Sequence, residues 1–107
     1  MELSFRTREI RLLCENPSKA ESTFGLAVSE YLRRRIADLH AARTVDDLVA
    51  GYPRFTDDTH GKMRIDIAGT HELLFQPNHQ SLSRDSAGLV DWTRIHRIQI
   101  VEIEEVS

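Results

Sequence analysis

The middle of the chain alternates between apolar and polar residues in two short stretches. Apolar residues occupy every second position of residues 63–67, and the alternation resumes over residues 71–75 after the turn at 68–70. A period of two is typical of a strand that buries one face, and a short turn containing glycine joins antiparallel strands. The pattern therefore predicts a β-hairpin over about residues 62–75.

Helical spacing dominates the first part of the chain. Thr7 is placed to cap a short helix that ends before Pro17. A longer helix follows, capped either by Asn16 or by Ser18 together with Glu21, and it is predicted to run to about residue 42. Its apolar stripe, at steps of three and four residues, consists of Ala20, Phe24, Val28, Tyr31, Leu32, Ile36 and Leu39.

Two further strands are predicted at the ends of the chain. Residues 2–6 alternate, with Leu3 and Phe5 facing inward. Residues 98–103 carry apolar side chains on both faces, so this strand is either bulged or covered on both sides. The order strand, helix, helix, hairpin, loop, strand predicts an α+β fold, with two N-terminal helices packed on one face of a small, mainly antiparallel β-sheet.

Length and composition indicate one small domain. The chain has 107 residues, of which 40% are apolar and 29% charged. These values suit one globular domain, residues 1–107, with enough surface to bury without disulfides. No apolar run approaches the roughly 20 residues of a membrane span, and the first residues lack the apolar core of a signal peptide. We therefore expect a cytoplasmic protein with no membrane partner.

Charge is unevenly distributed along the chain. The formal net charge of −3 argues against a protein held on nucleic acid by bulk charge alone. Most arginines nevertheless lie in the first two thirds of the sequence, whereas the final residues, IVEIEEVS, are acidic. A basic surface is therefore compatible with the negative total.

Cysteine and histidine usage does not indicate a metal site. Cys14 is the single cysteine, so no internal disulfide is possible, and a lone cysteine with apolar neighbours is usually a small core residue. The histidines lack the close spacing of zinc ligands. They are His40, His60, His71, His79 and His96.

Three segments together resemble a known family. They are LSFRTREIRLLCENPSKAESTFG near the start, HGKMRIDI followed by ELLFQP in the hairpin, and DWTRIHRIQIVEIEE near the end. In this order and spacing they resemble the RelE/ParE superfamily of bacterial toxins, and within it the HigB-type plasmid-maintenance killer proteins. The resemblance spans nearly the whole chain and implies the RelE-like fold.

The resemblance also implies a function. It implies the toxin of a type II toxin–antitoxin system, neutralised by a helix-turn-helix antitoxin similar to HigA. HigB-type members enter the ribosomal A site and cleave messenger RNA there without metal or other cofactor. The RNA's own 2′-hydroxyl is then the nucleophile. The expected partners are the antitoxin, the ribosome and messenger RNA.

Basic residues around the first hairpin strand form the expected site. Metal-free cleavage requires proton transfer from the 2′-hydroxyl and to the leaving 5′-oxygen, and stabilisation of charge on the phosphoryl oxygens. The resemblance assigns Lys62 and Arg64 to phosphate binding and catalysis, Arg54 to charge stabilisation from the preceding loop, and His60 to acid or base catalysis. The alternative is a solvated strand edge, with Arg64 paired to the cross-strand acid Glu72.

Two positions depart from the family pattern. Where Tyr-Arg usually precedes the apolar part of the second hairpin strand, this chain has His71 and Glu72, so an anion replaces a cation and repels phosphate. The acid, tyrosine and histidine that usually follow the last strand correspond to Glu105, Val106 and Ser107. Glu105 is therefore the expected catalytic residue of this tail.

Three classes of function remain open. The first is a ribosome-dependent messenger-RNA endonuclease. The second is a catalytically weakened or inactive binding module, which targets DNA gyrase or acts as a co-repressor with its antitoxin; the two departures favour it. The third is an unrelated small α+β interaction domain that shares only the fold.

Overall fold

The first part of the chain folds into one strand and a group of helices. The computed structural model describes residues 1–106, and their first elements are β1 Glu2–Phe5, α1 Arg8–Glu15, α2 Pro17–Phe24 and α3 Leu26–Ala41. Thr7 caps α1 by accepting a hydrogen bond from the Ile10 amide, and Asn16 caps α2 by accepting one from the Lys19 amide. Within residues 1–106 no helix combines the length and apolarity needed to cross a membrane.

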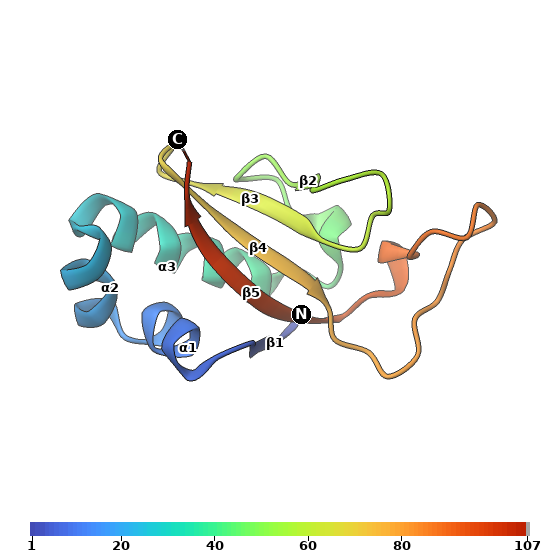
Figure 1. Ribbon diagram of the computed structural model, residues 1–107, viewed down its shortest axis with the longest axis horizontal. Helices are drawn as coiled ribbons and strands as arrows, with labels where there is room; N and C mark the ends of the chain where they lie inside the picture. Colours follow the sequence, from blue (N-terminus) through green and yellow to red (C-terminus); the bar gives the residue numbers. More distant parts are fainter. Residues whose placement is uncertain (107) are drawn as a thin grey trace.

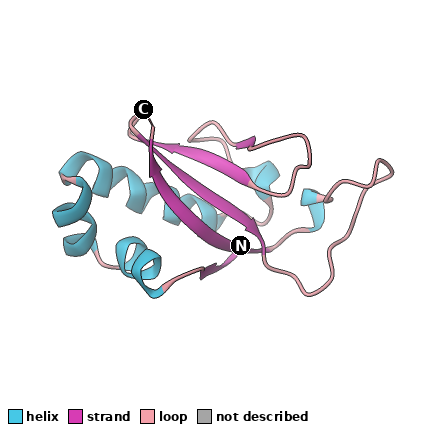
Figure 2. Ribbon diagram, in the orientation of Figure 1, coloured by secondary structure: helices cyan, strands magenta, loops and turns pink. Residues whose placement is uncertain are grey.

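The rest of the chain supplies most of the sheet. Its elements are the 3₁₀ turn η1 Val45–Asp47, β2 Arg54–Phe55, β3 Met63–Ile67, β4 His71–Pro77, the 3₁₀ turn η2 Trp92–Arg94 and β5 Arg97–Glu105. Across residues 1–106 the strand order is β1-β5-β4-β3-β2, with β1 parallel to β5 and the other neighbours antiparallel. Figure 1 and Figure 2 show the helices gathered at one side of this sheet. The α+β class and the mainly antiparallel sheet are confirmed.

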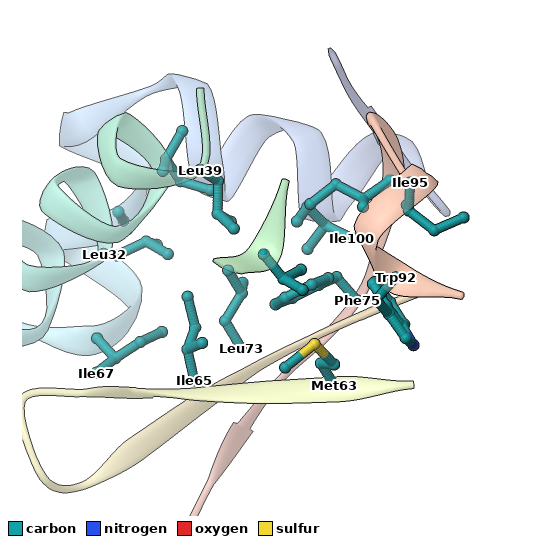
Figure 3. Packing of buried hydrophobic residues seen from close by; sticks show 14 of the residues in the cluster. Leu32, Leu39, Met63, Ile65, Ile67, Leu73, Phe75, Trp92, Ile95 and Ile100 are labelled. Carbon is teal, nitrogen blue, oxygen red and sulfur yellow. The ribbon is translucent and has the colours of Figure 1, made fainter. Parts of the chain in front are cut away.

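Every second residue of the central strands points toward the helices. Ile65 pairs with Leu73 across β3 and β4, Phe75 lies two residues further along β4, and each is at most 1% exposed. Leu32 and Leu39 of α3 belong to the same buried cluster, as Figure 3 shows. We call this side of the sheet the helix face.

The long helix expected after Pro17 is broken, so three helices rather than two precede the turn η1 in the described chain. The break lies at Gly25, whose backbone φ of 89° and ψ of 169° belong to a region that only glycine adopts readily. The apolar stripe continues on both sides of Gly25, and for this reason its periodicity does not reveal the break.

Strand β5 contains a bulge. A bulge was one of the two alternatives predicted for this strand, because its sequence carries apolar side chains on both faces. Phe75 pairs with Ile100 and Leu74 with Glu102, which leaves Val101 as the extra residue. After the bulge Ile103 returns to the helix face opposite Leu73. The register shift thus keeps the isoleucines of β5 on one side of the sheet.

Candidate functional site

The side of the sheet opposite the helix face carries most of the predicted site residues. We call it the polar face; it is defined by the alternate strand residues Arg54, Arg64, Asp66, Glu72, Leu74, Gln76, Gln99, Glu102 and Glu104. Arg54 and Arg64 are register partners of β2 and β3, so their side chains share this face. Arg54 was expected in a loop, but it belongs to strand β2, which is too short to show a periodic pattern.

Glu72 holds both arginines of the polar face. Its carboxylate lies 2.7 Å from Arg54 Nη2 and 3.2 Å from Arg64 Nη1. The Glu72 side chain is 8% exposed, whereas the two arginine side chains are 32% and 30% exposed. Arg54 Nη1 also lies 3.1 Å from a carboxylate oxygen of Asp66. The predicted pairing of Arg64 with Glu72 is therefore confirmed, and it extends to Arg54.

Lys62 lies beside this network without joining it. None of the ion pairs within residues 1–106 includes Lys62, whose side chain is exposed. Lys62 and Arg64 line one open hollow, together with Thr56, Asp57, Thr59, Gly61 and Leu74. Lys62 forms no ion pair with Asp57, the carboxylate of the same hollow, and its ammonium group is therefore available to an anion there.

The segment 56–62 forms a tight loop at the edge of the hollow. The Asp57 carboxylate accepts hydrogen bonds from the amide and hydroxyl of Thr59, and His60 follows with a φ of 58°. The ring of His60 stacks on Phe55 with a centroid distance of 3.9 Å. The carbonyl of His60 accepts a 2.7 Å hydrogen bond from the indole Nε1 of Trp92, which anchors the loop to the core.

Asp57 is a candidate residue that the sequence interpretation missed. Hydrogen bonds from Thr59 lower the pKa of the Asp57 carboxyl, and the nearby charges of His60 and Lys62 lower it further. Asp57 therefore shares its surroundings with two predicted site residues. The only sequence signal was the Asp-Asp-Thr turn that precedes His60.

Glu105 does not lie near Lys62 and Arg64. It pairs with His71 at the end of β4 and β5, and the His71 ring contacts Phe24 of α2 at a centroid distance of 5.2 Å. Glu105 thus lies on the helix face, at the far end of the sheet from Lys62. Val106 is exposed, and Ser107 lies outside the described residues.

Carboxylates outnumber cations around Glu72 on the polar face. Burial raises the pKa of Glu104, and a hydrogen bond and the like charge from Glu102 raise it further. The charge of Glu72 acts in the same direction, whereas Arg64 opposes it. This end of the face therefore disfavours an additional anion more than the end with Lys62, where Asp57 is the one carboxylate of residues 1–106 that lines the hollow.

Cysteine and metal chemistry find no support in the described chain. Burial, together with the negative charge of Glu15, raises the pKa of the Cys14 thiol to about 12, so the thiol is protonated at neutral pH. Within residues 1–106 no three histidine, cysteine, aspartate or glutamate side chains group closely enough to hold a metal ion.

Comparison with known proteins agrees with the fold. No protein-family model and no curated protein matches the chain. The structure is similar to that of a YoeB/ParE toxin from Agrobacterium tumefaciens, with a TM-score of 0.59 and 10% sequence identity, and the alignment covers 100% of both chains. At that identity the likeness concerns the fold, which is a RelE/ParE-like toxin fold.

Proposed function

We propose that this protein is the toxin of a type II toxin–antitoxin system, of the HigB type, and that it cleaves messenger RNA on the ribosome. The observation that carries the proposal is the hollow beside the 56–62 loop, where Lys62 and Arg64 meet on one face of the sheet. The toxin-like fold supports the same conclusion. The toxin acts as one domain in the cytoplasm and is neutralised by a HigA-like helix-turn-helix antitoxin.

In the proposed reaction the 2′-oxygen attacks the adjacent phosphorus and the bond to the 5′-oxygen breaks. Lys62 binds a non-bridging phosphoryl oxygen. Arg64 and Arg54, which Glu72 holds, offset the charge that develops there through their nearby positive charge and not by direct contact. The 2′-hydroxyl loses a proton and the leaving 5′-oxygen gains one. His60, whose ring stacks on Phe55 beside the hollow, makes one of these transfers through a water molecule, and solvent water makes the other. Glu105 is assigned no step, since it lies on the other face of the sheet.

Primer extension on a messenger RNA, with and without programmed ribosomes, tests the proposal. We expect cleavage only in the sample with ribosomes, and at least a tenfold lower rate for Lys62→Ala, because one positioned charge contact is lost. Lys19→Ala is the matched control, since Lys19 is an exposed lysine on α2, outside the hollow. Equal cleavage by both variants shows that Lys62 is not part of the site. No cleavage by the unmutated protein contradicts the proposed nuclease activity.

A second candidate function is a binding module without nuclease activity. The engagement of Arg54 and Arg64 by Glu72 favours it, because the arginines are then occupied in the absence of RNA. Such a module inhibits DNA gyrase or serves as a co-repressor with its antitoxin. A gyrase supercoiling assay, beside a binding assay with the protein encoded next to this chain, separates the two versions.

A further inference from the structure

Glu72 competes for the hydrogen-bond donors that a phosphate needs. Arg54 directs Nη2 to Glu72, and its Nη1 to Asp66 and to the carbonyl oxygen of Tyr52 at 3.0 Å. Arg64 directs Nη1 to both oxygens of Glu72, at 3.4 Å and 3.2 Å. A guanidinium binds phosphate best through two parallel N–H groups. On this face both Nη groups of Arg54 and Nη1 of Arg64 already have carboxylate partners, so a phosphate meets guanidiniums that are partly occupied.

The burial of Glu72 favours this occupied arrangement. The carboxylate is almost buried between two guanidiniums that are each about a third exposed. A buried carboxylate without its cationic partners is costly, so Glu72 retains the arginines more strongly than an exposed acid does. Lys62, in contrast, has no competing carboxylate among the ion pairs of residues 1–106.

We propose that Glu72 is an internal competitor for RNA phosphate: it keeps Arg54 and Arg64 away from the substrate and so determines how strongly the polar face binds single-stranded RNA. In the unmutated protein Lys62 alone of these three cations contacts a phosphate. Glu72 is a positioning residue, since it acts through the two arginines. The proposal rests on the proposed function, in which this face meets RNA.

The salt dependence of RNA affinity reports the number of phosphate contacts. Each phosphate neutralised on a single strand adds about 0.7 to the slope of log affinity against log salt concentration. Glu72→Gln keeps the side-chain shape and releases Nη2 of Arg54 and Nη1 of Arg64, while Asp66 still holds Nη1 of Arg54. We therefore expect a slope steeper than that of the unmutated protein by about 0.7 if Arg64 alone gains a phosphate and by about 1.4 if both arginines do. Between 50 and 200 mM salt this corresponds to about 2.6-fold to sevenfold greater weakening. The probe is a fluorescent single-stranded 2′-O-methyl RNA, which binds but cannot be cleaved.

Glu102→Gln is the matched control. Glu102 lies on the same face and its replacement removes the same charge, but Glu102 forms no ion pair within residues 1–106. We expect its slope to equal that of the unmutated protein. In the Glu72→Gln background, replacing Arg54 and Arg64 by glutamine is expected to restore the shallower slope.

Several outcomes overturn the proposal. Equal slopes for Glu72→Gln and the unmutated protein show that Glu72 does not withhold the arginines, while RNA binding itself stands. A slope for Glu102→Gln as steep as that for Glu72→Gln assigns the effect to bulk charge. If neither the unmutated protein nor Glu72→Gln binds the probe, the proposed RNA-binding function fails as well.

An NMR titration of the unmutated protein tests the same proposal without requiring the Glu72→Gln variant to fold. In the unmutated protein, the guanidinium signals of Arg54 and Arg64 are expected to stay unshifted at probe concentrations that shift the amide signal of Lys62. Arginine signals that move together with that of Lys62 show that Glu72 yields to phosphate, which contradicts the proposal.

Discussion

The two faces of the same strands differ in composition and in burial. In β3, Met63, Ile65 and Ile67 point to the helix face and are at most 5% exposed, whereas Arg64 and Asp66 point to the polar face and pair with neighbouring charges. The helix face supplies the burial that stabilises the fold. The polar face contributes less apolar burial, chiefly through Leu74, so its exposed charges can change while the fold persists.

The largest effect is expected on the helix face. Phe75 is fully buried and its ring meets Trp92 edge-on at 6.0 Å. We expect Phe75→Ala to lower the free energy of unfolding by about 3–5 kcal/mol, measured by urea denaturation. Leu74→Ala, one residue away on the polar face, is expected to cost about 2 kcal/mol. If both variants lose the same free energy of unfolding, the two faces do not differ in their contribution to stability.

A smaller effect is expected from the charge network itself. Glu72→Ala leaves Arg64 without a carboxylate and Arg54 with Asp66 alone. Because both guanidiniums are partly exposed, we expect a loss of about 1–2 kcal/mol in the same urea experiment. Glu102→Ala is the control and is expected to change stability by less than about 0.5 kcal/mol. A loss above that of Leu74→Ala contradicts the minor structural role of the polar face.

The next effect depends on pH. His79 Nε2 accepts hydrogen bonds from the amides of His96 and Arg97, at 3.3 Å and 3.2 Å. Burial and the positive charges of His96 and Arg97 lower the pKa of His79 from its usual 6.5. Neutral His79 therefore contributes stability that is complete above pH 6.5 and is lost as pH falls through the lowered pKa.

Thermal unfolding of the unmutated protein and of His79→Gln checks this dependence. Between pH 7.5 and pH 5.5 the Tm of the unmutated protein is expected to fall more than that of the variant, because glutamine does not titrate. Parallel Tm curves show that the His79 hydrogen bonds do not depend on its protonation.

The smallest effect on stability is expected at Lys62. Its side chain is exposed and forms no ion pair within residues 1–106, so Lys62→Ala is expected to change the free energy of unfolding by less than about 0.5 kcal/mol. The variant thus separates binding from folding: under the proposed function its RNA affinity falls, whereas its urea midpoint is unchanged. A shifted midpoint assigns Lys62 a structural role.

Local signals in the sequence predicted the elements that local chemistry determines. The caps Thr7 and Asn16 and the alternation of the hairpin gave the positions of α1, α2, β3 and β4. Strand β2 has two residues and no pattern of its own. The parallel pairing of β1 with β5 joins the two ends of the chain, and no local signal reports such a contact.

For the site, too, local patterns in the sequence were predictive, whereas contacts between distant segments were not. Alternation alone placed Lys62 and Arg64 on one strand face, and cross-strand pairing suggested Glu72 as a partner of Arg64. The second contact of Glu72, to Arg54, depends on β2, which the sequence did not reveal. The separation of Glu105 from Lys62 likewise follows from the register of β4 and β5.

The hydrogen bond between Trp92 and the carbonyl of His60 makes the molecule its own fluorescent probe. Trp92 is the single tryptophan of the chain, and its indole N–H is tied to the loop that borders the hollow. An indole that loses this bond and meets water shifts its emission to longer wavelength. Any ligand, protein partner or substitution that displaces the 56–62 loop is therefore visible in the intrinsic emission spectrum, without a label.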